Sequence, residues 1–340
     1  TLKDTRISST LRIHTLQKLN DKKTFRQTLW AGKPYNFFGD YLFNKYSFRV
    51  LKLPVNAGLS CPNRDGTTGT GGCIFCSEEG SASPTTRGIS SLTAQMTNAI
   101  NTFRRSYKET KYIAYLQAYS NTYADIDILK KIYDQCTSFP GITGLMIGTR
   151  PDCINENILQ LIKSYDRPGF ELWLELGLQS VHDKSLTFLE RGHTWEQTMS
   201  AIRLVSKFDI NLCTHVILGI PGESWFEMMH TAEVISALDV NGVKIHHLHV
   251  IKGTPLELIY RKNNIKLLSL REYISILCDF IERLRPDITI HRLAGDSPED
   301  KLLAPAWGLH KGTVLQAVTD EFNRRSTYQG FLYPDKGELL

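Results

Sequence analysis

Three of the chain's seven cysteines lie within one stretch of sixteen residues, and these residue types at this spacing point to metal chemistry. Cys61 and Cys73 flank a loop that contains four glycines, and Cys76 follows after two more residues. Glycine adopts backbone conformations that other residues avoid, so such a loop can curl tightly and bring three thiolates together. Thiolates bind soft metal ions and iron–sulfur clusters. The stretch therefore predicts a metal or cluster site.

The number of cysteines favours a cluster over a single ion. A structural zinc site is closed by four protein ligands, and no fourth Cys or His follows Cys76 at a suitable spacing. Three thiolates on a four-iron cluster leave one iron open, and an open iron can chelate a second molecule. A zinc site completed by a distant histidine stays open as an alternative. A disulfide is disfavoured because the cysteine count is odd and the other four cysteines are scattered singly.

The cysteine stretch resembles that of the radical S-adenosylmethionine (radical SAM) enzymes, in the YhcC/YtqA-type branch that is related to the catalytic subunit of Elongator. This branch has a long first gap, and here eleven residues separate Cys61 from Cys73. Further segments that carry the resemblance follow along residues 48–310. They are Gln117–Tyr123, Ile147–Cys153, Leu174–Ser180, Arg191–His193, His215–Glu223, His246–Thr254 and His291–Asp296.

The resemblance implies a radical SAM enzyme with two cofactors, a [4Fe-4S] cluster and S-adenosyl-L-methionine (SAM). Cys61, Cys73 and Cys76 would be the cluster ligands, and the open iron would chelate the methionine part of SAM. In this family the reduced cluster cleaves SAM to a 5′-deoxyadenosyl radical, which takes a hydrogen atom from an unactivated C–H bond. The family also needs a reducing electron donor such as flavodoxin or ferredoxin.

Matching positions give the residues expected to contact SAM. Glu175 lies where the family contacts the ribose, and a Glu inside an apolar strand is costly unless it is paired or functional. Its alternative role is a barrel carboxylate paired with a cation such as Arg191. The superfamily's Gly-Gly-Glu motif, which grips the amino group of SAM, is replaced here by Tyr119, Ser120 and Asn121. The full set of candidates is Phe75, Tyr119, Ser120, Asn121, Glu175, Gln179, Arg191 and Leu218.

A histidine cluster supplies candidates for substrate binding. His246, His247 and His249 end an apolar strand, where alternate side chains point to opposite faces. They are predicted to orient the substrate or to shuttle a proton, and the alternative is an ordinary polar role at the rim of a barrel. Lys252 is predicted to meet a phosphate or a substrate carboxylate. The isolated cysteines 136, 153, 213 and 278 are interpreted as buried apolar residues, although Cys153 is expected in a loop near the site.

The elements that position these residues alternate between apolar β-branched runs and longer helical patterns, which is typical of parallel strands joined by crossover helices. We predict strands at 48–55, 112–117, 144–149, 171–176, 212–218 and 243–250. We predict helices at 91–107, 126–136, 155–165, 195–208, 225–238 and 270–284. The cysteines and polar motifs follow the strands, where the loops of such barrels carry the chemistry.

The predicted fold class is therefore α/β, a partial (β/α)6 TIM-like barrel of the radical SAM type with N- and C-terminal extensions. We expect a basic extension over residues 1–47, the barrel over 48–255 and a helical or mixed extension over 256–340 that packs on the barrel. Hydrophobic residues make up 41% and charged residues 22% of the chain, which is ordinary for a globular protein. No apolar run approaches the roughly 18 residues of a membrane span. We expect a cytoplasmic protein with no membrane partner.

Positively charged residues are concentrated near the N-terminus. Residues 1–52 carry eleven Lys or Arg and three acidic residues, whereas the whole chain has a net charge of +5. Such a basic arm suits a polyanion, because Lys and Arg contacts to phosphates supply most non-specific affinity for nucleic acids. Neighbouring aromatic side chains could stack on bases or simply dock the arm on the barrel. They are Trp30, Tyr35, Phe37, Phe38 and Tyr41.

The resemblance and the basic arm together favour tRNA as the partner and the carbon-5 side chain of a wobble uridine as the substrate. A C–H bond next to nitrogen gives a stabilised carbon radical, so loss of a carboxymethyl group from a 5-carboxymethylaminomethyl uridine fits this chemistry. One alternative is a radical SAM reaction on another small molecule or on a protein. An alternative of another class is a non-catalytic iron–sulfur or zinc protein that binds RNA, which would hold metal without cleaving SAM.

Overall fold

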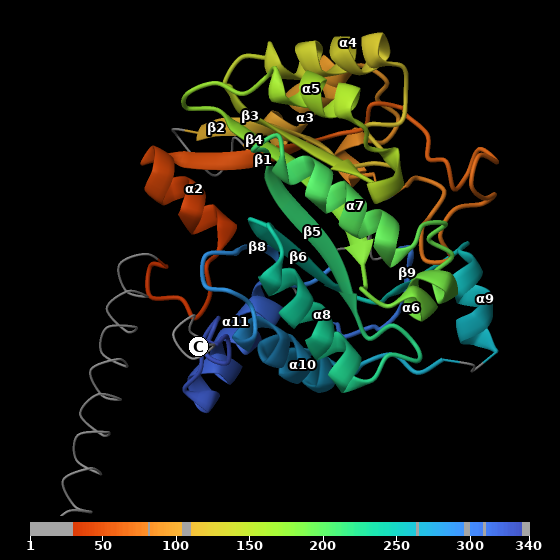
Figure 1. The fold of residues 1–340 in the computed structure, drawn as a ribbon, viewed down its shortest axis with the longest axis vertical. Helices are drawn as coiled ribbons and strands as arrows, with labels where there is room; N and C mark the ends of the chain where they lie inside the picture. The colour runs from red at the N-terminus through yellow and green to blue at the C-terminus, as the bar shows by residue number, and fades with distance from the viewer. Residues whose placement is uncertain are drawn as a thin grey trace, which may run out of the picture.

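The computed structural model describes residues 30–80, 82–103, 110–262, 265–295, 300–308 and 311–334. Its centre is a seven-stranded parallel sheet with the strand order β1-β2-β3-β4-β5-β6-β8 (Figure 1). The predicted α/β partial barrel is confirmed. Its strands are β1 (Arg49–Val55), β2 (Thr110–Leu116), β3 (Ile142–Thr149), β4 (Glu171–Gln179), β5 (Asn211–Leu218), β6 (Gly242–His247) and β8 (Thr289–Arg292).

The seventh strand of this sheet was not among the strands predicted from the sequence. β8 lies inside the predicted C-terminal extension, and it pairs in parallel with β6 at the edge of the sheet. It is four residues long and ends in His291 and Arg292. A strand this short, with two basic side chains, lacks the apolar run by which the other six were recognised. A further two-stranded antiparallel pair joins β7 (Val250–Ile251) to β9 (Leu302–Ala304).

The helices that follow the strands lie against the outer face of the sheet and bury the main apolar core (Figure 1). Leu145, Leu172, Leu174 and Leu176 belong to this core and are at most 3% exposed. α7, α8 and α10 each begin with a capping box, in which the first-turn Gln or Glu returns a hydrogen bond to the N-cap residue. The helices are α3 (Leu92–Phe103), α4 (Ile126–Thr137), α5 (Glu156–Lys163), α6 (Asp183–Phe188), α7 (Trp195–Ser206), α8 (Trp225–Ala237), α9 (Pro255–Arg261), α10 (Leu270–Glu282) and α11 (Lys311–Arg325).

Helix α2 (Phe38–Tyr46) covers the end of the barrel at which the strands begin. The Phe38 ring stacks on His291 with a centroid distance of 3.8 Å and meets Trp173 edge-on at 5.2 Å. Trp30, Tyr35 and Phe38 are buried, so these rings dock the segment on the barrel and are not exposed to stack on bases. The rest of the predicted basic arm, residues 1–29, lies outside the described residues.

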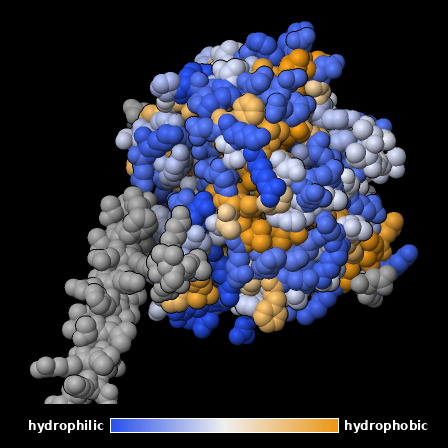
Figure 2. Space-filling model, in the orientation of Figure 1, coloured by the Kyte–Doolittle hydropathy of each residue, from blue (hydrophilic) through white to orange (hydrophobic). Residues whose placement is uncertain are grey.

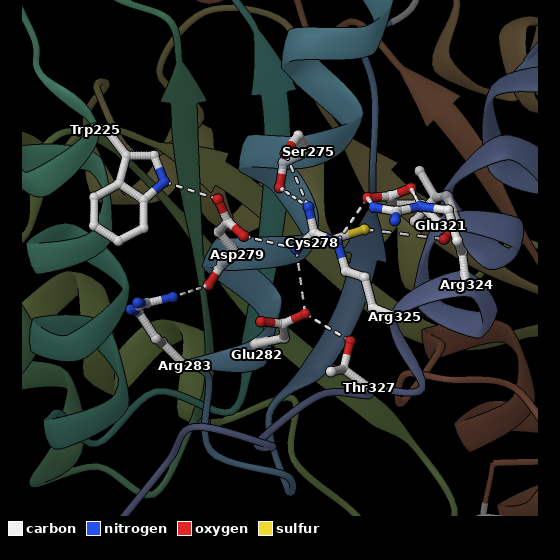
Figure 3. A network of polar contacts seen from close by, with 11 residues as sticks. Trp225, Ser275, Cys278, Asp279, Glu282, Arg283, Glu321, Arg324, Arg325 and Thr327 are labelled. Atoms are coloured by element: carbon white, nitrogen blue, oxygen red, sulfur yellow. Dashed lines mark hydrogen bonds and ion pairs between the residues drawn. The ribbon is translucent and has the colours of Figure 1, made fainter.

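The C-terminal helix α11 is held against α10 by a network of charged groups (Figure 3). The Arg325 guanidinium bonds to Asp279 at 2.6 Å and to Glu321 at 2.7 Å, and it also lies 3.3 Å from Glu282. A further bond from Arg325 reaches the Ser275 hydroxyl at 2.8 Å. The Arg325 cation therefore pairs with three carboxylates, two on α10 and one on α11.

The surface shown in Figure 2 is mostly hydrophilic, and its apolar residues include a group over α9. Within this helix Leu258 is 64% exposed, whereas Leu256 is fully buried. In the part of the chain that the structure describes, none of the helices combines the length and apolarity needed to cross a lipid bilayer.

Arg325→Ala is expected to lower the free energy of unfolding by about 2 kcal/mol, because three partly buried carboxylates would lose their shared cation. The matched control is Arg324→Ala, since Arg324 bonds to the same Glu321 but its side chain is 71% exposed. That control should cost less than about 0.5 kcal/mol. Urea unfolding of the two variants measures the difference, and equal losses would contradict a special role for Arg325.

Candidate active site

The cysteine loop leaves the end of β1 and is shaped by close backbone contacts. Gly72 has a φ of +88°, and a Cβ atom there would lie 2.9 Å from the Arg64 side chain. Arg64 in turn donates to the carbonyl oxygens of Cys76 at 3.2 Å and of Ser77 at 2.5 Å. The amide of Cys76 bonds to the Cys73 carbonyl at 2.9 Å and closes a tight turn. The glycines thus let an arginine fasten the two ends of the loop together.

Arg191 links the loop to the central strand of the sheet. Its Nη1 lies 3.2 Å from the Cys73 sulfur, and its Nη2 donates to the Gly177 carbonyl on β4 at 2.7 Å. A Cβ atom at Gly177 would lie 2.9 Å from the end of the Arg191 side chain, so the guanidinium packs directly over this glycine. The Asn63 amide approaches the same sulfur at 3.5 Å. Cys73 therefore has two donors that stabilise a thiolate.

The three cysteines line one cavity of about 500 Å³ at the ends of the strands. Its basic lining residues outnumber its acidic ones by seven to one. The single acidic residue is Glu79, which pairs with Arg87 at 2.9 Å and with Lys301 at 2.6 Å. The basic residues are Arg64, Arg87, Arg150, Arg191, Lys244, Arg292 and Lys301. Two carboxylates behind this lining, Asp152 and Glu175, pair with Arg150 at 2.7 Å and with Lys244 at 3.1 Å. The remaining charge of the cavity is positive and suits an anionic occupant.

The residues around the cysteines fit an anionic iron–sulfur cluster. All three cysteines are free thiols. The buried atoms Arg150 Nη1 and Arg191 Nε have no hydrogen-bond partner among the described residues, so each leaves an N–H group to be satisfied. Burial and the neighbouring Cys73 raise the pKa of Cys76, and the cations Arg64 and Arg191 oppose that rise. The positive charge needed to hold several thiolates is in place.

A single zinc ion fits the cysteines less well. Zn–S bonds of about 2.3 Å would hold the sulfur atoms roughly 4 Å apart. Among the described residues, the only set of three Cys, His, Asp or Glu ligand atoms that all lie within 4.8 Å of one another is Glu175, Cys213 and His291. The three cysteine sulfurs are therefore spread more widely than one zinc ion allows.

Five of the predicted SAM contacts line the cavity. Phe75 packs against the apolar cluster around Ile74, and Gln179 ends β4 with a φ of +70°. Tyr119 donates to the Glu78 carbonyl at 2.5 Å and lies beside Gly80. The five lining residues are Phe75, Tyr119, Ser120, Gln179 and Arg191. Their contacts with SAM stay predictions.

The other three candidates lie behind the cavity wall. The Asn121 amide donates to the carbonyls of Leu116, Ala118 and Gly148, so it ties the ends of β2 and β3 together. Leu218 belongs to the core under the helices, and its neighbour Ile217 lines the cavity instead because side chains alternate along a strand. Glu175 is fully buried.

Glu175 is the centre of a polar network inside the barrel. Its Oε2 accepts from the Tyr115 hydroxyl at 2.6 Å, from His215 at 2.8 Å and from Lys244 at 3.1 Å. Lys244 also bonds to the Tyr115 hydroxyl. Glu175 is therefore paired with a cation, but this cation is Lys244, and Arg191 is bonded elsewhere. A contact between Glu175 and SAM stays a prediction.

Burial and the contacts within this network determine which of its side chains are ionised at neutral pH. Burial alone would raise the pKa of Glu175, but Lys244, His215 and Lys52 hold it well below the usual range. Burial, assisted by Lys244, lowers the pKa of His215 to about 4. Burial and the nearby Lys52 lower the pKa of His291 to about 3. At neutral pH the carboxylate is therefore ionised and the two imidazoles are uncharged.

A second group with the spacing of metal ligands consists of Glu175, Cys213 and His291. A lysine ammonium already lies beside these side chains. The Lys52 ammonium lies 3.7 Å from Glu175 Oε1 and 3.4 Å from His291 Nδ1. Burial raises the pKa of Cys213 well above the normal value, so the thiol stays protonated. A lysine in this position leaves no anionic pocket for a metal ion.

The predicted histidine cluster reaches the cavity, whereas Lys252 does not. His246, His247 and His249 all line it, and His247 also packs on Trp307 at a centroid distance of 4.2 Å. Lys252 is exposed and donates to the Asp300 carbonyl at 2.9 Å. The neighbouring Lys301 lines the cavity in its place. The roles of the histidines in substrate binding stay predictions.

The remaining residues to place are Cys153 and several site residues that were not predicted from the sequence. Burial raises the pKa of Cys153 to about 12, and this thiol is not among the cavity-lining residues that the structure describes. Sequence reasoning assigned no role to Lys244, although a charged residue in an apolar strand is the signal that identified Glu175. It also missed Asn63, Arg64 and Arg292, whose roles depend on contacts distant in sequence.

Comparisons with known proteins agree with this geometry. The family described as the radical SAM superfamily matches residues 64–235, and the radical SAM C-terminal domain matches residues 240–324. The chain is 35% identical to YtqA of Bacillus subtilis (strain 168) over 298 residues, which are 88% of this chain and 92% of that relative.

Two further matches cover a smaller share of the other protein. The solved structure of Methanocaldococcus infernus Elp3 with an N-terminal deletion has a similar fold, with a TM-score of 0.62 and 17% identity over 82% of this chain and 64% of that structure. The tRNA uridine(34) acetyltransferase of Methanocaldococcus jannaschii is 31% identical over 137 residues, which are 39% of this chain and 24% of that protein.

Glu175→Gln is expected to lower the free energy of unfolding by about 3 kcal/mol, because it leaves Lys244 and Lys52 buried beside a neutral amide. Glu79→Gln is the matched control, since its carboxylate also serves two cations but its side chain is 36% exposed. That control should cost less than about 1 kcal/mol. Urea unfolding tests the pair, and an equally small loss in both would show that the barrel interior does not depend on the carboxylate.

Proposed function

The chain belongs to the radical SAM superfamily, in the branch of YtqA and of YhcC from Escherichia coli, and on this premise we propose that it modifies the carbon-5 side chain of a wobble uridine in tRNA. Its cofactors are a [4Fe-4S] cluster and SAM, as in the rest of the family. When bound, they supply the one-electron chemistry that removes a hydrogen atom from an unactivated C–H bond.

The protein's part is to hold the cluster and to control its surroundings. Cys61, Cys73 and Cys76 would be the ligands. Arg191 and Asn63 donate to the Cys73 sulfur, and donors of this kind tune the reduction potential of a cluster. The Arg64 bonds across the loop keep Cys76 in place beside them.

The barrel also limits access to the reacting groups. At the end where the strands begin, Phe38, Trp173 and His291 pack together and close the interior. Next to the cysteines, Ile74 is buried in an apolar cluster with Leu189 and Ile217. The ring packing therefore shields the interior from water at the end where the strands begin, and the apolar cluster does so beside the cysteines.

The observation that carries the tRNA proposal is the excess of basic side chains around the cavity, seven against one acidic residue. Near the cysteines, Arg64 adds positive charge that can attract a polyanion, whereas Arg150 is paired with Asp152 at 2.7 Å. The partial likeness to a protein whose name gives uridine 34 of tRNA as its target supports the same choice. A C–H bond beside the nitrogen of a carbon-5 aminomethyl side chain suits hydrogen-atom removal.

Cys76→Ala is expected to lose the iron and sulfide of the reconstituted protein, about four of each per chain, because a ligand of the cluster is removed. Cys153→Ala is the matched control, as it removes a buried thiol that does not line the cavity. Iron and sulfide analysis with the visible absorption spectrum compares the two. Equal cluster content in both variants would contradict the ligand assignment.

The proposed function is tested anaerobically with the reconstituted protein, dithionite and SAM. We expect 5′-deoxyadenosine, measured by mass spectrometry, to rise on addition of tRNA that carries 5-carboxymethylaminomethyl uridine, together with a change in the mass of that nucleoside. Formation that is indifferent to this tRNA would keep the radical chemistry and refute the tRNA substrate. A fully loaded cluster that yields no 5′-deoxyadenosine with any addition would favour a non-catalytic RNA-binding protein.

A further inference from the structure

Tyr115 is the one tyrosine among the described cavity-lining residues whose hydroxyl donates to a carboxylate. It bonds to Glu175 Oε2 at 2.6 Å, and the Lys244 ammonium donates to the same hydroxyl. Tyr119 also lines the cavity, but its hydroxyl donates to the backbone carbonyl of Glu78, which is a far weaker base than a carboxylate. A carboxylate acceptor makes a phenol easier to oxidise, so Tyr115 is the tyrosine of the lining that most readily gives up an electron or a hydrogen atom.

The charges around Tyr115 favour a neutral radical over a radical cation. The ammonium groups of Lys244 and Lys52 lie 4.6 Å and 5.3 Å from the centroid of its ring. Two cations oppose a positive charge on the ring, so an electron leaves only together with the hydroxyl proton. Burial and the nearby Glu175 raise the pKa of Tyr115 well above its usual value, so the phenol keeps its hydrogen at neutral pH. Tyr115 is therefore suited to transfer a whole hydrogen atom.

A tryptophan lies in register with Tyr115, two strands away. Tyr115 on β2 pairs with Met146 on β3, and Met146 pairs with Trp173 on β4. Neighbouring strands lie roughly 4.8 Å apart, so the Cα atoms of Tyr115 and Trp173 are separated by roughly 10 Å. The three side chains belong to one buried cluster and are at most 3% exposed. A thioether packs well against aromatic rings and is itself oxidisable, so Met146 bridges the two ring systems.

A second buried carboxylate continues the arrangement towards the surface. The Trp173 indole N–H donates to Glu171 Oε2 at 2.7 Å, and the Tyr46 hydroxyl donates to Glu171 Oε1 at 2.8 Å. Glu171 is fully buried, whereas Tyr46 on α2 is half-buried. Tyr115, Trp173 and Tyr46 thus each donate to a carboxylate that can accept a proton. This pairing lowers the cost of losing an electron, because the proton can leave with it.

We propose that Tyr115, Trp173 and Tyr46 form an aromatic relay, which removes an oxidising equivalent from the cavity when a radical formed there fails to react with the substrate. Tyrosine and tryptophan lose an electron more readily than aliphatic side chains, and a phenolic O–H bond is weaker than an unactivated C–H bond. The relay protects the glycine-rich loop and the cavity wall from radical damage. This inference goes beyond the proposed function, because it needs the family's radical chemistry and no particular substrate.

The relay balances in atoms and electrons. Tyr115 first donates its hydroxyl hydrogen atom to the carbon radical, so the O–H bond breaks, a C–H bond forms and a neutral phenoxyl radical remains. An electron from Trp173 and a proton from the Lys244 ammonium restore the phenol, while the indole N–H proton passes to Glu171. Glu171 returns that proton to Trp173 as an electron arrives from Tyr46, and it takes the Tyr46 hydroxyl proton in exchange. A soluble one-electron reductant of the flavodoxin or ferredoxin class then reduces Tyr46, which recovers its proton from Glu171, and water reprotonates Lys244.

The first experiment asks where the hydrogen atom comes from. The reconstituted full chain is equilibrated in heavy water and mixed with dithionite and SAM without any substrate, and mass spectrometry measures the deuterium in 5′-deoxyadenosine. Hydroxyl hydrogens exchange with solvent and C–H hydrogens do not, so we expect the parent to add one deuterium. Tyr115→Phe should lose most of this label. Tyr165→Phe is the matched control and should keep it, since Tyr165 donates to the Asp134 carboxylate at 2.7 Å but lies outside the described cavity lining.

The outcomes of this experiment are distinct. Equal deuterium in the parent, Tyr115→Phe and Tyr165→Phe overturns the proposal, because the label then comes from dithionite or water. An unlabelled nucleoside in the parent overturns it as well. If Tyr115→Phe does not fold or forms no nucleoside, the second experiment decides, since its variants leave Tyr115 in place.

The second experiment follows the oxidising equivalent along the relay. Samples are frozen at intervals after SAM is added, and electron paramagnetic resonance detects tyrosyl radicals, which ring-deuterated tyrosine identifies through the change in hyperfine pattern. Trp173→Phe should prolong the Tyr115 radical severalfold, because the next step of the relay is lost. Tyr46→Phe should also prolong it, because the equivalent no longer reaches the surface. Tyr41→Phe is the control and should not, although the Tyr41 ring lies 6.2 Å from that of Trp173, because its hydroxyl accepts from Lys45 at 3.5 Å.

The position of oxidative damage gives an independent readout that a merely structural role of these rings does not move. After turnover without substrate, peptide mass spectrometry should find oxidation products at Tyr46 in the parent and at cavity-lining residues in Trp173→Phe. Unchanged radical lifetimes in both Trp173→Phe and Tyr46→Phe refute the relay. A longer lifetime in Tyr41→Phe alone overturns the assigned exit. If Trp173→Phe fails to fold, Tyr46→Phe removes only one hydroxyl group and keeps the test valid.

Discussion

The ionised Glu175 side chain is the constraint on which the interior of this barrel depends. Barrels of parallel strands are usually filled by layers of aliphatic side chains. Here one carboxylate lies on the central strand and accepts hydrogen bonds from β2, β5 and β6, while the Lys52 ammonium of β1 and the His291 imidazole of β8 lie next to it. Because a buried charge has to be paired, this one residue determines which side chains the surrounding strands must present.

The layer that contains Glu175 lies between two differently built ends of the barrel. At one end, Phe38 of α2 packs against both His291 and Trp173, which also contact each other, and the three rings close the interior. At the other end, the glycine-rich loop brings three thiols to the cavity and Arg191 joins the loop to β4. The result is a polar chamber that is closed at the end where the strands begin and has the cysteines at the other end. Radical chemistry benefits from such a shape, because it excludes water while leaving room for a substrate.

The C-terminal part of the chain is an integral component of this chamber. β8 supplies His291 and Arg292 to the interior, although it lies within the region matched by the radical SAM C-terminal domain. α10 packs beneath the sheet, and α11 is fastened to it through Arg325 (Figure 3). The charges that face a substrate therefore come from both halves of the chain, so the helical tail contributes to the site through the strand it supports.

The sequence by itself determined the six longer strands, six of the ten α-helices that the structure describes and the cysteine cluster, because each leaves a local pattern of apolar spacing or ligand spacing. Tertiary structure alone decided the rest. The meeting of Lys52, Glu175 and Arg292 joins residues more than a hundred positions apart, and the bulge that turns Arg292 inward depends on the pairing of β6 with β8. Strand alternation put Ile217 in the cavity and Leu218 behind it. Which face a side chain occupies is set by strand register, and register is a property of the assembled sheet.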